Sequence, residues 1–131
     1  MHRPLPWILA LTVLFSAPAF AAPLTEEQKI DALIHSVEVL PDARFIRNGS
    51  AYDGKAAAEH LRLKRRNAGG RVKTASDFIK YCASRSSMSG KPYQIRFANG
   101  DTVDAEVFFR TELERIEAGS NGVREPLPQH R

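Results

Sequence analysis

Residues 83–93 read Ala-Ser-Arg-Ser-Ser-Met-Ser-Gly-Lys-Pro-Tyr, and no other part of the chain looks so unlike core-forming sequence. Serine-rich segments that contain glycine and proline are typical of loops, because serine hydroxyls bond nearby backbone groups and compete with regular structure. A capping pattern at Thr74–Asp77, followed by apolar residues with helical spacing, predicts a short helix over 75–83 before this loop. Alternating apolar residues predict a strand over 92–97 after it. The segment therefore connects a helix to a strand.

The part of the chain after the loop predicts a hairpin and a last helix. Asn99-Gly100 fits a two-residue turn, and Thr102-Val103 begins the return strand. Asp104 is suited to cap a helix that ends near Ala118, although alternating apolar residues over 103–107 leave a longer return strand open. Residues 119–131 offer little to bury and are predicted to form a disordered tail.

The part of the chain before the loop predicts two longer helices and a short strand. A capping box at Thr25–Gln28 precedes an apolar stripe with helical spacing, which predicts a helix over about 26–39. Arg44–Arg47 is a brief β-prone run that Asn48-Gly49 closes with a turn signal. Ser50 or Asp53 can cap the next helix, over about 54–67, which ends at glycines 69 and 70.

This order of elements predicts a small α+β domain over residues 22–118, with about four helices around a minimal antiparallel sheet. The sheet would consist of the short strand near 44–47 and the hairpin near 93–103. The single cysteine, Cys82, excludes an intrachain disulfide.

The first 21 residues are expected to be a signal peptide. Met1-His2-Arg3 is a short basic start, Pro4–Phe15 is apolar, and Ala19-Phe20-Ala21 matches the small residues at which such peptides are cleaved. The apolar run is shorter than the roughly 20 residues that a membrane span needs. We therefore expect cleavage after Ala21, a periplasmic location and no integral membrane span in the mature protein.

Four motifs occur in a fixed order: Phe45-Ile46-Arg47-Asn48-Gly49, Ala57-x-x-His60-Leu61-Arg62-x-Lys64, Thr74-Ala75-x-x-Phe78-Ile79, and Ala83-Ser84-x-Ser86-Ser87-x-Ser89-Gly90-x-Pro92-Tyr93. Together they resemble a family of small exported proteins of Gram-negative bacteria that is described only as a domain of unknown function (number 5329). The likeness covers about Leu24–Glu117. It implies a periplasmic location and a shared fold, and it implies no activity.

A run of basic residues that contains no acid is the main functional lead. It comprises Arg62, Lys64, Arg65, Arg66, Arg71 and Lys73. Such a cluster attracts anionic partners, although a solvated helix face is the simpler explanation of a charge run. In an exported protein the expected partner is an anionic envelope component or an acidic protein, and nucleic acid is not expected. The leading hypothesis is a non-enzymatic binding or accessory module that presents this basic surface and the serine-rich loop.

The candidate binding residues come from the basic run, the serine-rich loop and the motifs beside them. They are Arg47, Asn48, His60, Arg62, Lys64, Arg65, Arg66, Arg71, Ser84, Ser86, Ser87, Ser89 and Tyr93.

The alternative hypothesis is a small hydrolase in which a loop serine is the nucleophile and His60 its base. A loop in which serine hydroxyls bond backbone groups is the structural explanation of the same residues. His60 is expected to be a buried neutral imidazole bonded to a backbone or serine group, with a position lining a site as the other interpretation. No catalytic residue or cofactor is assigned. A metal site is not expected either, because no second metal ligand stands beside His60 at a suitable spacing.

Overall fold

The computed structural model describes residues 23–120 and the isolated positions 2, 4 and 12. Apart from positions 2, 4, 12, 119 and 120, the predicted signal peptide and the predicted tail lie outside the described residues. The described elements are, in order, α1 (Glu26–Glu38), β1 (Arg44–Arg47), β2 (Ser50–Tyr52), α2 (Gly54–Ala68), the 3-10 turn η1 (Gly69–Arg71), α3 (Ala75–Phe78), the π-helical turn η2 (Ile79–Ala83), β3 (Gln94–Arg96), β4 (Thr102–Asp104) and α4 (Ala105–Ser120).

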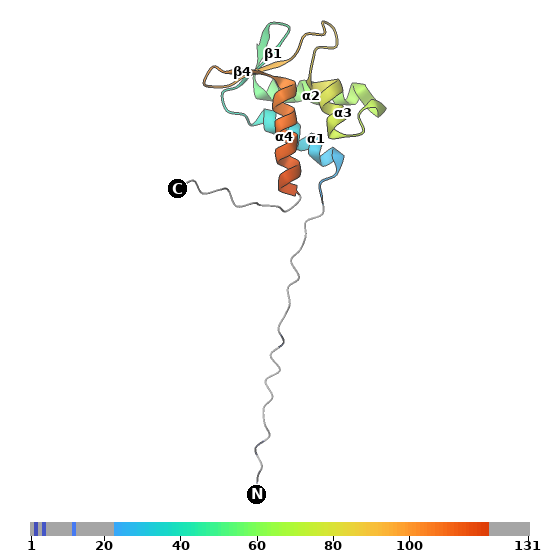
Figure 1. Cartoon of the computed structure of the whole chain (residues 1–131), viewed down its shortest axis with the longest axis vertical. Helices are drawn as coiled ribbons and strands as arrows, with labels where there is room; N and C mark the ends of the chain where they lie inside the picture. The colour runs from blue at the N-terminus through green and yellow to red at the C-terminus, as the bar shows by residue number, and fades with distance from the viewer. Residues whose placement is uncertain (1, 3, 5–11, 13–22, 121–131) are drawn as a thin grey trace.

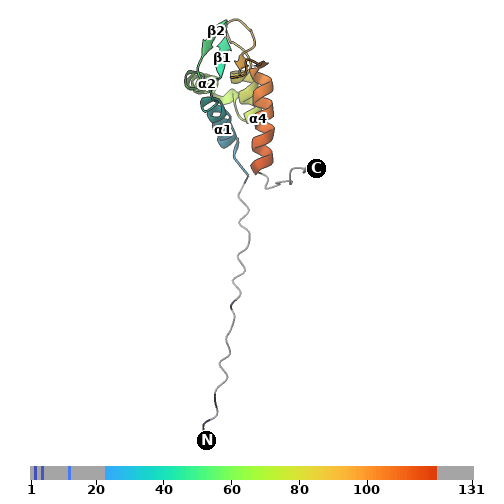
Figure 2. The same ribbon diagram turned by 90° about the vertical axis from the view of Figure 1, so that its left-hand side faces the viewer.

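The strands form an antiparallel sheet in the order β2-β1-β3-β4. They gather at one end of the molecule, and α4 runs away from them (Figure 1). The view turned by 90° shows α1 and α2 on one side and α4 on the other (Figure 2). The predicted α+β class, with helices around a small antiparallel sheet, is confirmed. None of the helices in the described part of the chain has the length and apolar composition that crossing a membrane requires.

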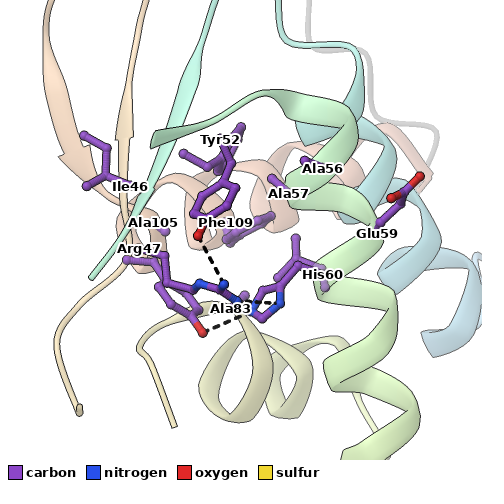
Figure 3. Close-up of a pocket in the computed structure, with 13 residues that line it drawn as sticks. Ile46, Arg47, Tyr52, Ala56, Ala57, Glu59, His60, Ala83, Ala105 and Phe109 are labelled. Atoms are coloured by element: carbon purple, nitrogen blue, oxygen red, sulfur yellow. Dashed lines mark hydrogen bonds between the residues drawn. The ribbon is translucent and has the colours of Figure 1, made fainter. Parts of the chain in front are cut away.

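The segment after β1 differs from the prediction, because it returns as a second strand. Asn48 and Gly49 have φ angles of 50° and 78°, the positive values that a type I′ two-residue hairpin turn requires. Ser50 therefore pairs with Arg47 in β2 and caps no helix, while Asp53 caps α2 by accepting from the amide of Ala56 at 2.8 Å. The hairpin brings Tyr52 close to Arg47 (Figure 3).

The β3–β4 hairpin is present as predicted, but its turn is longer. The amide of Phe97 donates to the carbonyl of Asp101 at 2.8 Å, so Ala98–Gly100 form the loop rather than Asn99-Gly100 alone. Asp104 is the final residue of β4 and directly precedes α4, so the last helix begins at the position predicted from the sequence. The amide of Ala105 then donates to the carbonyl of Tyr93 at 2.8 Å, which ties the start of α4 to the chain beside β3.

The predicted helix over 75–83 forms, but it changes type halfway. Thr74 and Asp77 make the expected capping box at its start. After Phe78 the backbone widens into the π turn η2, and the hydroxyl of Ser84 donates to the carbonyl of Ile79 at 2.6 Å. Such turns occur often at functional sites, and no periodicity in the sequence distinguishes them from an α-helix.

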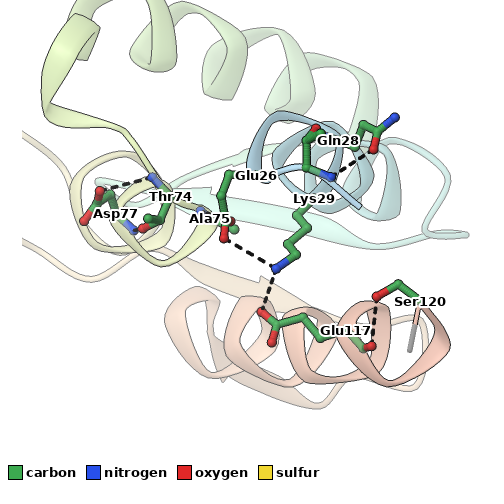
Figure 4. Close-up of polar contacts among 9 residues, drawn as sticks. Glu26, Gln28, Lys29, Thr74, Ala75, Asp77, Glu117 and Ser120 are labelled. Carbon is green, nitrogen blue, oxygen red and sulfur yellow. Dashed lines mark hydrogen bonds and ion pairs between the residues drawn. The ribbon is translucent and has the colours of Figure 1, made fainter. Parts of the chain in front are cut away.

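The helices meet around α1, which packs against α2, α3 and α4. Its apolar stripe of Ile30, Leu33, Ile34 and Val37 is buried as predicted. At its start, Glu26 accepts from the amide of Ala75 at 2.9 Å, and Lys29 lies between Glu26 and Glu117 of α4 (Figure 4). Polar contacts therefore join three helices at the end of the core away from the sheet.

The first residue of α2 lies against the last turn of α1. A Cβ atom at Gly54 would stand 2.5 Å from the carbonyl oxygen of Val37 and 3.1 Å from that of Glu38. Both are backbone atoms, so they cannot move aside as a flexible side chain would. Only glycine permits this approach of the two helices.

We expect Gly54→Ala to destabilise the protein by about 1–3 kcal/mol, because the added methyl must push the two helices apart. Urea denaturation measures the change. Gly70→Ala is the matched control, since a Cβ at Gly70 meets nothing within 4 Å. An equal, small effect of both substitutions would show that the approach at Gly54 is not constrained.

Candidate functional site

A cavity of about 190 Å³ lies between the β1–β2 hairpin and α2. Most of its wall is apolar, and the apolar residues that line it include Phe45, Ala57, Leu61, Ala83, Ala105 and Phe109. Its polar side chains come from the hairpin, from α2 and, in the case of Tyr93, from the residue before β3. Figure 3 labels those of the hairpin and of α2. A small pocket with an apolar wall and a few convergent polar groups is the usual form of a ligand site.

Two regular spacings place the polar groups at this pocket. On α2, His60 and Leu61 lie three and four residues after Ala57, and Lys64 lies four and three residues after them, so these side chains share a face. On β1, Phe45 and Arg47 are two residues apart and lie on the same side of the strand. The pocket forms where this face of α2 meets this side of β1.

Arg47 joins the hairpin to α2. One terminal nitrogen of its guanidinium, Nη1, lies 2.8 Å from Nδ1 of His60 and 3.0 Å from Nε2. The other, Nη2, donates to the hydroxyl of Tyr52 at 3.3 Å, and the guanidinium carbon lies 5.0 Å from the centre of that ring. A guanidinium only donates, so the ring nitrogen that bonds to it must accept, and His60 is neutral.

Tyr93 continues this network on the other side of His60. Its hydroxyl lies 3.3 Å from Nε2 of His60 and accepts from the ammonium of Lys64 at 3.0 Å. One tautomer of the neutral imidazole donates to this hydroxyl, and the other accepts from it. The hydroxyl of Tyr93 is therefore shared between His60 and Lys64. We call Arg47, His60, Lys64 and Tyr93 the pocket cluster.

The pKa values around the pocket cluster follow from this arrangement. Burial lowers the pKa of His60, and the positive charges of Arg47 and Lys64 lower it further. The hydrogen bond from Arg47 and its charge lower the pKa of Tyr52. The site therefore favours an uncharged imidazole beside two permanent cations.

Those two cations have no acidic partner in the described part of the chain. Arg47 and Lys64 are half-buried, and their hydrogen bonds go to neutral groups: His60, Tyr52, Tyr93 and the carbonyl of Arg85. Glu59 also lines the pocket, but its carboxylate points away from the cluster (Figure 3). No carboxylate of the described residues therefore neutralises the positive charge of the cluster.

The rest of the basic run faces elsewhere. Arg62 pairs with Glu38 at 2.6 Å and Arg65 with Asp31 at 2.8 Å, so these two side chains join α2 to α1. Arg62, Arg65 and Arg66, together with Lys73, line a second, wider groove, whose other residues include Glu27 and Asp31. Arg71 lies exposed in η1. Residues that are neighbours in the basic run thus point to different parts of the surface. Lys64 is the one member of the run that belongs to the pocket cluster.

The serine-rich loop is tied to the tip of the β1–β2 hairpin. The side-chain amide of Asn48 donates to Ser86 at 3.2 Å, and the hydroxyl of Ser89 donates to the amide oxygen of Asn48. We call this set of contacts the Asn48 bridge. Ser86 also accepts from the amides of Met88 and Ser89, and Ser87 lies exposed on the same loop. Ser84 and Ser86 are buried.

These contacts correct the expectation for His60. It is half-buried, lines the pocket and bonds to Arg47 and Tyr93, rather than being buried against a backbone or serine group. In the described part of the chain no serine hydroxyl is hydrogen-bonded to His60. A nucleophile and its base need that contact, so the geometry does not favour the hydrolase hypothesis.

Two further observations concern metals and thiols. Nowhere among residues 23–120 do three histidine, cysteine or acidic side chains gather as metal ligands would. Cys82 is buried in the core, and burial raises the pKa of its thiol.

Tyr52 is not among the site residues predicted from the sequence, because no strand was expected after Asn48-Gly49. The signal was present, since a two-residue turn at that dipeptide sets Tyr52 directly opposite Phe45. A tyrosine opposite an apolar strand residue would then have been expected at the same pocket.

Comparisons with known proteins place this pocket within a recognised family region. A family model described as "Family of unknown function (DUF5329)" matches residues 24–117, which contain the whole pocket. The "Uncharacterized protein YfeK" of Salmonella typhimurium is 40% identical over 84 residues, which is 63% of this chain and 70% of that protein. No solved structure matches the chain significantly.

We expect His60 to titrate below its ordinary pKa of 6.5, as an NMR titration of its ring protons can measure. The Arg47→Met substitution should raise that pKa partway, because burial, the largest cause of the shift, remains. The unfolded state binds the proton more readily than the folded state, so stability falls as the pH drops from about 6.5 toward the folded pKa. The difference in free energy of unfolding between the wild-type protein and the His60→Gln variant should therefore change over the same pH range. A difference independent of pH would contradict the assigned neutral state.

Proposed function

The chain belongs to the family of unknown function DUF5329, and we propose that it is an exported, non-enzymatic binding module that holds an anionic group at the pocket cluster. The observation that carries the proposal is the pair of half-buried cations, Arg47 and Lys64, which contact only neutral groups beside an apolar pocket. Charged groups in such surroundings have lost part of their hydration. An anion would replace that hydration with charge-assisted hydrogen bonds, which are stronger than neutral ones.

The free hydrogen-bonding groups of the cluster support an anion more than any other ligand class. A guanidinium has five N–H donors, and the contacts to His60 and Tyr52 leave several of them available. The cluster therefore offers donors, and the oxygens of an anion accept from donors.

The position of the pocket supports the same choice of site. The basic run contributes less to anion binding than its sequence implies, because Arg62 and Arg65 already have carboxylate partners. The π turn η2 ends at Ala83, which lines the pocket, and π turns are frequent beside binding sites. The proposed site is thus the pocket cluster, and the serine-rich loop acts by supporting the hairpin next to it.

Export is the second part of the proposal and rests on residues 1–21. Their basic start, apolar run and small residues at Ala19 and Ala21 are the features of a cleaved leader. The anion would then be a solute or envelope component of the periplasm. The family region, residues 24–117, begins directly after the proposed cleavage site.

Anion binding can be tested with acetate and inorganic phosphate titrated into isotope-labelled protein and followed by NMR. We expect saturable shifts of the Arg47 and His60 side-chain signals, with a dissociation constant on the order of 1 mM. Arg47→Met should weaken binding about tenfold or more, because a hydrogen bond to a charged group is lost. Arg96→Met removes the same charge from the exposed face of β3 and should change nothing. The proposal fails if neither anion gives a saturable shift.

Export can be tested by the mass of the protein recovered from each cell fraction. The periplasmic fraction should contain a species that begins at Ala22, since cleavage after Ala21 removes the leader. A double substitution, Ala19→Leu with Ala21→Leu, should leave the precursor uncleaved, because the cleavage site requires small residues. Recovery of the full-length chain from the cytoplasm of wild-type cells would refute export.

A further inference from the structure

We propose that the ligand of this site is a small aromatic monocarboxylate, whose single ring enters the cavity while its carboxylate binds Arg47. This inference rests on the proposed function and specifies the anion. Three features of the pocket support it: its volume, the chemistry of its wall and the charge at its rim.

The volume limits the ligand to one ring. The cavity measures about 190 Å³. For comparison, a cavity of about 150 Å³ lined by Leu, Ile and Phe is known to take up benzene, whereas drug-sized ligands occupy roughly 300–1,000 Å³. The pocket thus accommodates a benzene-sized group with one or two further carbons. A nucleotide, a two-ring system or a long acyl chain is too large for the pocket to enclose.

The wall selects an apolar, flat group. Phe45 and Phe109 contribute aromatic surface, and Tyr52 and Tyr93 add two further rings. Aromatic rings pack well edge-to-face and offset against one another. The alanines that line the cavity present little more than a methyl group each and leave the space that a ring can fill. A sugar fits poorly here, because its buried hydroxyls would lack hydrogen-bond partners.

The rim selects a single negative charge. Among the described residues that line the pocket, Arg47 is the one cation. Lys64 lies behind Tyr93, where it donates to the hydroxyl of that tyrosine and to the carbonyl of Arg85. A carboxylate matches the planar fork of one guanidinium with two parallel hydrogen bonds. A dianionic phosphate ester would keep half of its charge unpaired at this position.

The contacts already present need not break for this ligand to bind. Nη1 and Nη2 of Arg47 each use one N–H toward His60 and Tyr52, so other N–H groups can face the carboxylate. His60 and Tyr52 then act as positioning residues, since they fix the orientation of the guanidinium without contacting the charge themselves.

The test compares five probes on the wild-type protein by calorimetry: phenylacetate, acetate, benzyl alcohol, phenyl phosphate and naphthylacetate. Phenylacetate should bind at least about tenfold more tightly than acetate, because burial of the ring adds to binding by the carboxylate. It should also exceed benzyl alcohol, which lacks the charge, and naphthylacetate, which is too large.

Two variants locate the ring and the carboxylate separately. Ala57→Val narrows the pocket and should reduce the affinity for phenylacetate to that for acetate, while acetate itself is unaffected. Ala51→Val adds the same atoms on the exposed strand β2 and should change neither affinity. Arg47→Met should lower the affinity for phenylacetate about tenfold or more and leave that for benzyl alcohol unchanged.

The outcomes separate this inference from the proposed function. If acetate and phenylacetate bind equally, the inference is wrong and the anion site remains. If phenyl phosphate or naphthylacetate binds more tightly than phenylacetate, the deduction from charge or from volume is wrong. If neither acetate nor phenylacetate binds, both proposals fail together. If Ala57→Val does not fold, the probe series on the wild type and Arg47→Met still decides the matter.

Discussion

The backbone contact between Gly54 and the last turn of α1 is the constraint on which the site depends. It fixes where α2 begins and how closely it lies on α1. The buried residues of α2, Ala57, Ala58 and Leu61, then fix the rotation of the helix about its own axis. The ion pairs of Arg62 and Arg65 with α1 accompany this arrangement. Because successive helical residues differ by about 100° in direction, this rotation turns His60 and Lys64 toward β1. The pocket is thus a consequence of how two helices meet, and its polar groups are positioned by the packing of α2.

The features predicted correctly are those determined by neighbouring residues. The capping boxes at Thr25 and Thr74 and the apolar stripe of α1 are local, so the helices form where the sequence places them. The two Asn-Gly dipeptides show the limit of prediction from neighbouring residues. Asn48-Gly49 forms a two-residue turn and Asn99-Gly100 part of a longer one, because the register of the flanking strands decides the turn. The π turn is equally invisible in the sequence, since it keeps the apolar pattern of a helix.

The candidate site was predicted in part. Arg47, His60, Lys64 and Tyr93 were all among the candidates, and the fold brings them together from three segments. The run that contains Arg62, Lys64 and Arg65 looked like one surface, but consecutive positions on a helix point in different directions. Their separate partners depend on tertiary contacts, which spacing alone does not reveal. The cavity itself is a property of packing and could not be deduced from any motif.

The Asn48 bridge has a consequence for motion within the folded state. It joins Asn48 to Ser86 and Ser89, which lie 38 and 41 residues further along the chain, and it uses both the nitrogen and the oxygen of the amide side chain. When the serine-rich loop opens, the hairpin tip loses its anchor as well, so amide protons of both segments should exchange with solvent as one cooperative unit. A segment that opens with its neighbour costs more free energy to move than either would alone. The β1 wall of the cavity is therefore stabilised against fluctuation by contacts that lie outside the cavity.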